Sequence, residues 1–583
     1  MSSKSLNVLM IYLRDYFSIH IKGRSVGGTG GTHLNPLLRY WTQVETGRPF
    51  LKNAKESIAA QLAWRRATLT IGAKSISMIG TVIENSLPCS WSAFQGEARF
   101  DSPADMKVSE AAFRHFTNLQ SLNMSGCDQN VITDDAFRHL KNLRSLNMQG
   151  CNQTKITDDA FRHLTNLKSL NISYCNQGTI TDDLFRHLEN LQGLNMSRCN
   201  RIADDAFRHF TNLRSLNVRG CQSVTAYAFR HLTKLDYLDM SECDQSTITD
   251  DAFRHLGNLR SLDMARCFRR TIANAFEHLA SLQSLDISEC TRIKDEAFLY
   301  LTNLQSLDVS HCTQISGNAF RYLTNLRSLD MEQCNQTAIT DDDFRHLTNL
   351  EALNMNRCSQ GSITDKAFQH LTNLMFLDME ECSQTVLTDD AFRHLENLQT
   401  LNMNRCRQST ITNDAFRHLM NLRSLNMGHC TQNLITGDAF RHLSKLLSLD
   451  MKWCLQTTIT DNAFQHLTNL QRLNMSVCNQ STITNAAFQH LRSLQRLEMS
   501  GCDQLTITDD AFRHLENLKS LNISKCNQMT ITNDAFRHLT KLYHLNMSYC
   551  TQETITDHVY QHLTNLEILN YHIKKRPVSI WGH

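Results

Sequence analysis

Hydrophobic and polar residues alternate in short runs that return along most of the chain. In "LQSLNM", residues 119–124, the alternation places Leu122 and Met124 on one face and Ser121 and Asn123 on the other. A period of two residues is the pattern of a short β-strand that is buried on one face. Each such run therefore predicts one strand with its leucine and methionine directed into a core.

A second phrase, "ITDDAFRHL" at residues 132–140, returns unchanged from positions 156, 248 and 507 and predicts a short helix. Thr133 stands where an N-cap is expected, and the two aspartates after it place negative charge in the first turn, which the helix dipole favours. Phe137 and Leu140 lie three residues apart and share a buried stripe. Asn142 is the residue expected to adopt a left-handed conformation and lead the chain into the next strand.

The cysteines give the period of the repeat. After Cys89 they lie at 127, 151, 175, 199, 221, 243, 267, 290, 312 and 334, and then every 24 residues to Cys550. Nineteen units carry the cysteine, and a twentieth, "LEILNYH" from Leu566, begins without one. A single unit cannot bury its apolar face, but stacked units share a continuous core of Leu, Met, Ile and Phe. The repetition predicts an elongated stack instead of several globular domains.

One unit, "LQSLNMSGCDQNVITDDAFRHLKN" at 119–142, resembles the cysteine-containing subtype of leucine-rich repeats. The resemblance implies an α/β solenoid, a leucine-rich-repeat horseshoe with a parallel sheet on the concave face and short helices on the convex face. It implies an N-terminal cap or diverged adaptor-binding segment at 1–105, about 19–20 repeats of 22–24 residues at 106–572, and a C-terminal tail at 573–583. Most units depart from the subtype by two extra residues after the cysteine and by a phenylalanine in the helix.

Proteins of this subtype are often substrate-recognition subunits of F-box ubiquitin ligases, so the resemblance implies an SCF-type substrate receptor as one function. An F-box opening at Leu87-Pro88 would have too little room, because the first repeat helix is expected to be running at Ala111. A diverged F-box further upstream is left open. The helix-favouring segment 54–69 is interpreted as a cap over the first strand's open edge. The glycine-rich residues 27–32 are interpreted as a mobile loop, since no Gly-Lys-Ser/Thr follows.

Bulk composition limits the partners that the chain can have. The sequence holds 59 Lys and Arg against 57 Asp and Glu, a formal net charge of +2, which argues against a nucleic-acid binder. The apolar run at residues 6–13 is too short to cross a bilayer and lacks a signal-peptide cleavage pattern. We therefore expect no membrane partner and an intracellular, cytoplasmic location.

The repeated polar columns invite chemical interpretations. The cysteine column contains no C-x-x-C pair and is interpreted as buried reduced thiols, which suits a reducing compartment. Eighteen of the 26 histidines fall in the "HL" column, where Tyr300 and Tyr322 are substitutes. This column predicts a hydrogen-bond ladder between neighbouring helices, not a zinc or haem array, and a loss of stability as pH falls through about 6. The sequence predicts no metal, no cofactor and no catalytic residue.

Specificity has to come from residues that vary within exposed columns. Two columns vary, the residue before each cysteine and the residue before the second strand leucine. Arginine and aromatic residues are the types enriched at protein-binding hot spots. Their density between Arg357 and Arg496 nominates a partner-binding patch, with scattered neutral variation as the alternative; its members are Arg357, Phe376, Arg405, Trp453, Arg472 and Arg496.

The sequence therefore predicts a noncatalytic scaffold that binds another protein on the concave face of its repeats. The alternative, from the resemblance alone, is the ubiquitin-ligase substrate receptor, with the ligase's adaptor subunit as a partner. An enzyme is ranked lower, because no nucleophile with a base and no cofactor loop stands out from the repeats, so residues 1–105 would have to carry it.

Overall fold

The computed structural model describes the backbone of residues 69–71 and 97–100 and most of the chain from 113 to 570. Short gaps fall at 115, 128–131, 177, 244–248, 268–274, 335–337, 360, 383–386, 407–408, 431–432, 455, 527 and 551–552. The glycine-rich loop, the F-box candidates, residues 54–68 and the tail at 573–583 lie outside the described residues. The chain divides into two units, residues 1–269 and 270–583, which are described in turn.

In the first unit, short strands follow one another in sequence order. They are β1 (Leu69–Ile71), β2 (Glu97–Phe100), β3 (Ser121–Asn123), β4 (Ser145–Asn147), β5 (Ser169–Asn171), β6 (Gly193–Asn195), β7 (Ser215–Asn217), β8 (Tyr237–Asp239) and β9 (Ser261–Asp263). Each pairs in parallel with the next, and the strand leucines lie side by side, as Leu122 does with Leu146. Two segments of the predicted cap, β1 and β2, extend this sheet ahead of the repeats.

The second unit is built in the same way. Its strands are β10 (Ser284–Asp286), β11 (Ser306–Asp308), β12 (Ser328–Asp330), β13 (Ala352–Asn354), β14 (Phe376–Asp378), β15 (Thr400–Asn402), β16 (Ser424–Asn426), β17 (Ser448–Asp450), β18 (Arg472–Asn474), β19 (Arg496–Glu498), β20 (Ser520–Asn522), β21 (His544–Asn546) and β22 (Ile568–Asn570). All neighbours pair in parallel and in register, leucine beside leucine.

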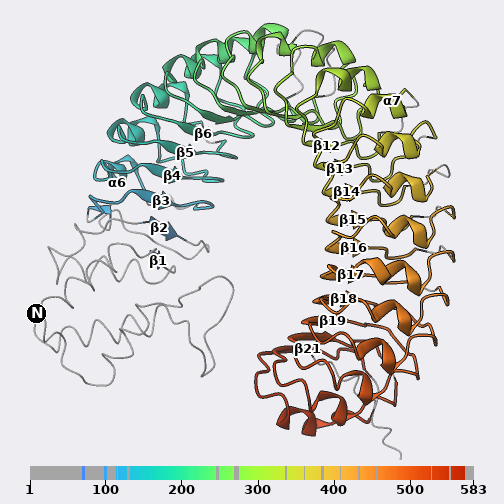
Figure 1. The fold of residues 1–583 in the computed structure, drawn as a ribbon. Coiled ribbons are helices and arrows are strands. Elements are labelled where there is room, and N and C mark those ends of the chain that lie inside the picture. Colours follow the sequence, from blue (N-terminus) through green and yellow to red (C-terminus); the bar gives the residue numbers. More distant parts are fainter. Residues whose placement is uncertain are drawn as a thin grey trace, which may run out of the picture. The chain divides into compact units, whose positions relative to one another are not determined.

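Helices cover the other side of each sheet (Figure 1). The first unit has α6 (Asp134–Phe137), η1 (Asp158–His163), η2 (Asp182–His187), η3 (Asp204–His209), η4 (Ala226–His231) and η5 (Asp250–Phe253). The second has η6 (Ala275–His278), η7 (Asp295–Phe298), η8 (Gly317–Tyr322), α7 (Asp341–Phe344), η9 (Asp365–Phe368), η10 (Asp389–Phe392), η11 (Asn413–Phe416), η12 (Gly437–His442), η13 (Asp461–Phe464), η14 (Asn485–Phe488), η15 (Asp509–Ala511), η16 (Asn533–Phe536) and η17 (Asp557–Gln561).

The core between sheet and helices is the one that the alternation predicts. In the repeat of β3, Leu122 is 1% exposed and Met124 is fully buried, whereas Ser121 and Asn123 lie partly open on the other face. The helix phenylalanines stack from repeat to repeat, with 6.3 Å between the ring centroids of Phe137 and Phe161. The predicted α/β solenoid, a parallel sheet on one side and short helices on the other, is confirmed within each unit.

Among the described residues, most of the helices are 3-10 helices of three to six residues, and only α6 and α7 are α-helical. So few residues cannot offset the cost of nucleating an α-helix, and the tighter 3-10 turn closes within one repeat. Thr133 occupies the N-cap position of α6 as predicted, but its side chain makes no capping hydrogen bond there. The expected cap is formed in the next repeat, where the hydroxyl oxygen of Thr157 accepts from the backbone N–H of Asp159 at 3.2 Å.

The first aspartate of each helix does more than complement the dipole. Asp134 accepts from the backbone N–H of Thr157 at 2.8 Å and from its hydroxyl at 2.7 Å, so it joins its own repeat to the next. Where asparagine replaces this aspartate, both hydrogen bonds remain, but the one to the threonine hydroxyl changes direction. The side-chain oxygen of Asn413 accepts from Thr436 N, and its amide donates to the Thr436 hydroxyl. This inter-repeat bond is a second source of cohesion beside the core.

The expected left-handed conformation at Asn142 is wrong. Asn142 instead donates its side-chain amide to the carbonyl of Thr117 in the preceding repeat, at 2.9 Å. The left-handed residue is the one before the cysteine, for example Gly126 at φ +68° and Arg357 at φ +56°. The chain turns sharply out of the strand there, and glycine is the residue that enters this region without steric cost.

Candidate functional site

The sheet face of the second unit carries the variable residues. In each repeat five side chains point away from the core, on the strand and at its two ends; in the repeat of β13 these are residues 351, 352, 354, 356 and 357. The structure places Phe376, Arg472 and Arg496 first on β14, β18 and β19. It places the other three nominated residues, Arg357, Arg405 and Trp453, at the left-handed position beyond β13, β15 and β17. The six residues thus form two rows on one face, and no single cluster.

Two of the nominated arginines are held by a glutamate that sequence reasoning did not single out. Glu381 lies between them and accepts from Arg357 Nε at 2.8 Å and from Arg405 Nη1 at 2.5 Å. The hydrogen bond from Arg357 lowers the pKa of the Glu381 carboxyl, so the ion pair persists at neutral pH. Glu332 approaches Arg357 at 3.7 Å from the other side. Because their charge is matched locally, these two arginines are weaker anchors for a partner than the sequence indicates.

A hollow opens beside Phe376, at the edge where β12 to β15 begin. Its volume is about 410 Å³, and Arg327, Asn349, Glu351, Asn373, Met375, Asn397 and Gln399 line it. The asparagines are fixed, since each donates to a threonine carbonyl of the preceding repeat, as Asn373 does to Thr348 at 3.0 Å. Met375 and Phe376 are 37% and 38% exposed, so they present apolar surface beside this polar hollow.

The remaining nominated residues lie further along the same face. The Trp453 indole is 48% exposed and stacks on the His429 ring, with 5.6 Å between the ring centroids and an interplanar angle of 11°. Arg472 and Arg496 are paired in register on adjacent strands, and Nε of Arg496 donates to Glu498 at 2.8 Å. Two guanidinium groups side by side leave an excess of positive charge at this place.

Charge divides this face into two parts. From β10 to β15 the outward positions hold nine carboxylates and three arginines; this acidic half contains Asp286, Glu289, Asp308, Arg327, Asp330, Glu332, Glu351, Arg357, Asp378, Glu380, Glu381 and Arg405. From β16 to β21 they hold six cations and two carboxylates; this basic half contains Arg423, Asp450, Lys452, Arg472, Arg496, Glu498, Lys519 and Lys525. Composition alone, with its balance near zero, conceals the division.

In the acidic half, Asp308 is the carboxylate whose ionised form is disfavoured most strongly. Burial raises the pKa of its carboxyl to about 6, and Asp286 and Asp330 on the neighbouring strands act in the same direction. Its Oδ1 accepts from Ser310 N at 2.9 Å, a bond that an asparagine can also accept. Asparagine occupies the equivalent position in the repeat of β13, where the amide of Asn354 donates to Asp330 at 2.9 Å.

Replacing Asp308 by asparagine is therefore expected to stabilise the protein. A carboxyl whose folded pKa is raised costs stability above that pKa, and the cost disappears as pH falls through about 6 to the unfolded value near 4. We expect a gain of about 1 kcal/mol at pH 7.5, after discounting for solvent, and a smaller gain at pH 4.5. Urea unfolding of both chains at the two pH values measures it. The reverse change, Asn354→Asp, should destabilise; a neutral or destabilising Asp308→Asn would contradict the assignment.

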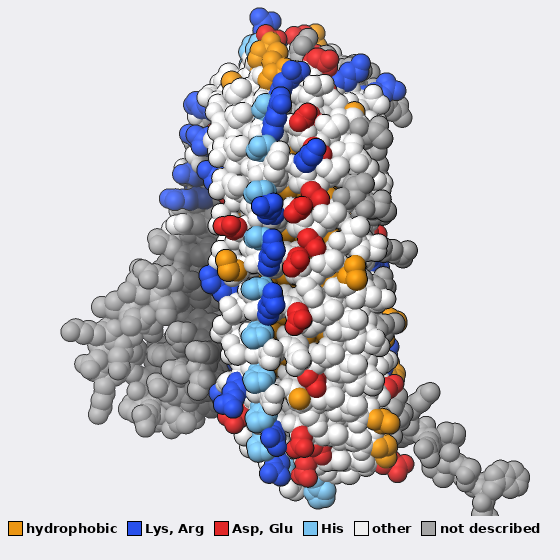
Figure 2. All heavy atoms as spheres, turned by 45° about the vertical axis from the view of Figure 1, so that its right-hand side comes forward, with side chains coloured by type: hydrophobic (Ala, Val, Ile, Leu, Met, Phe, Trp, Pro, Cys, Tyr) orange, Lys and Arg blue, Asp and Glu red, His pale blue; other side chains and the backbone are white. Residues whose placement is uncertain are grey.

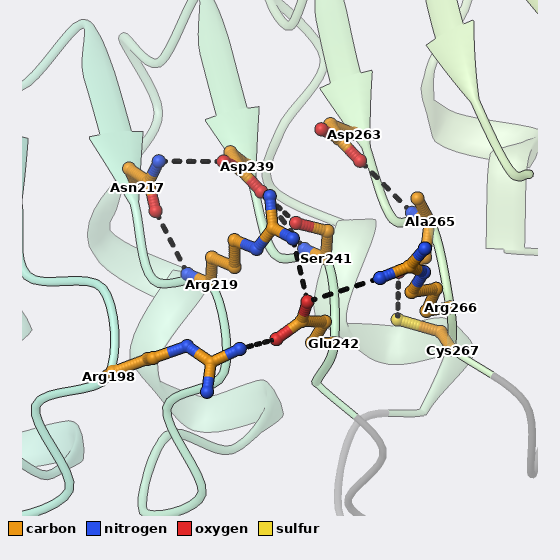
Figure 3. Close-up of polar contacts among 10 residues, drawn as sticks. All are labelled: Arg198, Asn217, Arg219, Asp239, Ser241, Glu242, Asp263, Ala265, Arg266 and Cys267. Atoms are coloured by element: carbon orange, nitrogen blue, oxygen red, sulfur yellow. Dashed lines mark hydrogen bonds and ion pairs between the residues drawn. The ribbon is translucent and has the colours of Figure 1, made fainter. Parts of the chain in front are cut away.

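In the first unit three arginines converge on one glutamate (Figure 3). Arg219 Nη2 lies 2.6 Å from Glu242 Oε1, Arg266 Nη1 lies 3.7 Å from the same oxygen, and Arg198 donates to the other oxygen. Arg198 reaches across an intervening repeat, which Gly220 permits, since an added Cβ there would lie 3.2 Å from Arg198 Cγ. Sequence reasoning missed this cluster, although three of its members stand in the column before the cysteine.

The described cysteines of the repeats are thiols that form no disulfide, as predicted. Most of these thiols are fixed by the preceding repeat: Cys151 Sγ donates to the Met124 carbonyl at 2.9 Å, and Cys454 Sγ donates to the Met427 carbonyl at 3.0 Å. Burial raises the pKa of Cys199 to about 12. A thiol held protonated in this way is a packing residue and a poor nucleophile.

Native protein should consequently resist thiol alkylation. With iodoacetamide at pH 8, we expect negligible modification of Cys406 and Cys454, which are fully buried, until the chain is unfolded in urea. Cys267 and Cys550 are the partly exposed cysteines among the described repeats and should react first. Peptide mass spectrometry after timed labelling reads out each site separately. Rapid labelling of Cys406 in native protein would contradict its burial.

The histidine column runs along the helix side, beside a line of arginines and a line of acidic residues (Figure 2). The predicted ladder between neighbouring helices is wrong: each bonded imidazole takes its hydrogen bond from the residue before it in the same repeat. Arg138 Nε donates to His139 Nε2 at 3.0 Å, and Gln369 occupies the same place beside His370. Because this partner is adjacent in sequence, it stays within reach of the exposed imidazole, and the hydrogen bond forms within the repeat.

The column still predicts a loss of stability in acid. An arginine N–H can donate only to a neutral imidazole, and desolvation followed by the Arg138 charge lowers the pKa of His139, against the opposing effect of Asp135. The pKa values of His163, His209 and His514 are lowered in the same way. The unfolded chain then binds protons first as pH falls below 6.5.

Thermal melts should therefore give a lower Tm at pH 5 than at pH 7.5. Carboxylates also titrate in this range, so a variant with His139→Tyr and His163→Tyr, using the residue found at Tyr300 and Tyr322, separates the contributions. Its Tm should change less between the two pH values than that of the wild type. Equal changes in both chains would show that the column is irrelevant to acid stability.

Within the part of the chain that the structure describes, no group of three or more His, Cys, Asp or Glu side chains is arranged to hold a metal ion. Nor does any described helix have both the length and the apolar character needed to cross a bilayer.

The short parallel strand, the left-handed turn, the short helix and the hydrogen bonds between neighbouring repeats together define a leucine-rich-repeat protein. Within that class the chain belongs to the family described as "BspA type Leucine rich repeat region", whose family model matches residues 106–236, 222–351, 313–447 and 433–567. This is a different description from the cysteine-containing subtype that the motif resembles. No curated protein matches the chain.

Solved structures support the fold at low sequence identity. A TLR13–ssRNA13 complex is 20% identical over 82% of this chain and 84% of that one, with a TM-score of 0.51. The Drosophila Toll–Spatzle complex is 16% identical over 87% and 88%, with a TM-score of 0.55. Its glycosylated form is 18% identical over 84% of this chain and 64% of that one, with a TM-score of 0.52. At such identities the likeness establishes the solenoid alone.

Proposed function

We propose that this chain is a noncatalytic scaffold that holds another protein against the sheet face of its second unit. The observation that carries the proposal is the set of exposed Phe376, Trp453, Arg472 and Arg496 side chains on a sheet whose other outward positions are mostly short polar or charged residues. Residues of these types supply most of the binding energy in protein interfaces. The solved neighbours include receptors titled as complexes with a protein or an RNA, and both ligand classes are compatible with the solenoid.

A photo-crosslinker tests the location directly. The full chain is expressed with p-benzoylphenylalanine at Phe376, at Trp453 or, as the control, at Met420, which is 56% exposed outside the sheet. We expect the crosslinker at position 376 or 453 to capture the same protein, and the crosslinker at position 420 not to capture it. Joining from Met420 alone would refute the sheet-face location. Charge reversal at Arg472 should weaken capture more than reversal at Arg357 or Arg405, because Glu381 already matches the charge of the latter two.

A ubiquitin-ligase substrate receptor is the narrower alternative, and it depends on the family resemblance of the repeats. It requires an adaptor-binding element within residues 1–105. Co-purification of the full chain with a ligase adaptor subunit, lost on substitution within that segment, would support it; co-purification with a sheet-face partner alone would favour the free-standing scaffold. An intracellular location belongs to the same proposal, since a column of reduced thiols suits a reducing compartment.

A further inference from the structure

We propose that the protein bound by the second unit presents two patches of opposite charge, an acidic patch to the basic half and a basic patch to the acidic half. This rests on the function proposed above and specifies the chemistry of the partner. The two halves are consecutive on one sheet, so a single folded partner that lies across the strands covers both. The two patches of opposite charge would also fix the orientation of the partner on the sheet.

The acidic half keeps an excess of negative charge after its internal pairs are formed. Glu381 is matched by Arg357 and Arg405, and Glu351 is matched by Arg327. Within the described part of the chain, Asp308 and Asp330 form no ion pair; they accept from Ser310 N and from the Asn354 amide. Neighbouring carboxylates on parallel strands about 4.8 Å apart repel one another, and a cationic partner surface would relieve that repulsion.

The basic half has the opposite excess. Glu498 is held by Arg496, and its second oxygen accepts from the Asn522 amide at 2.7 Å. Arg472, on the adjacent strand, forms no ion pair with any described carboxylate. The ammonium group of Lys519 donates to the neutral Gln495 at 3.1 Å. Trp453 stands at the border of this half and supplies apolar area that an acidic segment with an aromatic or aliphatic side chain can cover.

A nucleic acid fits this face less well than a protein does. The basic half spans β16 to β21, about 24 Å at the spacing of parallel strands. A uniform polyanion longer than this would run onto the acidic half, where carboxylates outnumber arginines nine to three. Only a surface that itself changes sign complements both halves.

Charged decamers test the two halves in the full chain. Fluorescein-labelled deca-glutamate, deca-lysine and deca-thymidylate are titrated at 50 and 150 mM salt, with anisotropy as the readout. We expect Arg472→Glu with Arg496→Glu to weaken deca-glutamate binding at least tenfold, and Asp308→Asn with Asp330→Asn to weaken deca-lysine binding severalfold. The control, Arg393→Glu with Arg417→Glu on the helix side, changes net charge as the first pair does and should leave deca-glutamate binding within twofold.

Three results would overturn the proposal. One is deca-thymidylate binding more tightly than deca-glutamate and being lost in the same arginine variant, which would make the basic half a nucleic-acid site. Another is equal loss of deca-glutamate binding in the helix-side control. The third is a partner that crosslinks from Phe376 and Trp453 yet binds both charge variants as it binds the wild type; the scaffold function would then stand and only the bipolar chemistry would fail. Crosslinking from Met420 alone would instead refute the scaffold's location.

Discussion

Phe440→Ala is expected to destabilise the second unit by about 3–5 kcal/mol, the range for truncating a buried phenylalanine. Its ring is fully buried and lies 6.5 Å from the centroid of Phe416 in the preceding repeat. The cavity would open at the junction of repeats, where a solenoid has its only long-range cohesion. Urea unfolding followed by circular dichroism measures the change.

The matched control is Phe376→Ala, the same change at a side chain that is 38% exposed on the sheet face. It should cost less than about 1 kcal/mol, as most surface substitutions do, while weakening partner capture. The pair thus separates a residue that builds the stack from one that is available to a ligand. Equal costs at the two positions would show that Phe376 is part of the core.

Local rules were enough to predict the strands and the core. Leu122 and Met124 follow from a period of two, and Phe137 with Leu140 follows from helical spacing, because each pattern depends only on residues within one repeat. The type of helix could not be predicted from this pattern, because a 3-10 turn and an α turn bury the same residues. The left-handed position was also hidden, because only four of the repeats reveal it with glycine, as Gly126 does.

Interactions between repeats were the part that a repeat-by-repeat interpretation missed. Asp134 looks like a residue that complements its own helix dipole, and its bonds to Thr157 appear only when repeats are stacked. Arg357 and Arg405 looked available until Glu381 was placed between them. The signal was present in the sequence, since these three residues stand 24 apart in one column. Comparing each column across neighbouring repeats, with stacking distance in mind, would have found the pair and the division of charge.

One exception to the inter-repeat bond yields the sharpest prediction. Where most repeats have a bridging aspartate or asparagine, η8 begins with Gly317, which has no side chain to offer Thr340 of the next repeat. Asp343, which belongs to the same repeat as Thr340, supplies the acceptor: its Oδ2 accepts from Thr340 N at 2.7 Å and from the hydroxyl at 3.0 Å. An added Cβ at Gly317 would lie 1.7 Å from Asp343 Cγ, so the Asp343 carboxyl occupies the space that the missing aspartate leaves.

Asp343→Ala should therefore cost about 1–2 kcal/mol in the wild type, the value of losing an N-cap acceptor, although alanine is the usual residue at this position in other repeats. With Gly317→Asp introduced as well, the standard bridge can form and the same change should cost less than about 0.5 kcal/mol. Asp342→Ala, which removes an exposed charge from the same helix, is the control and should be nearly neutral. Urea unfolding of the four chains of this cycle measures the coupling between positions 317 and 343. Additive effects would mean that the Asp343 carboxyl does not stand in for the acceptor that Gly317 lacks.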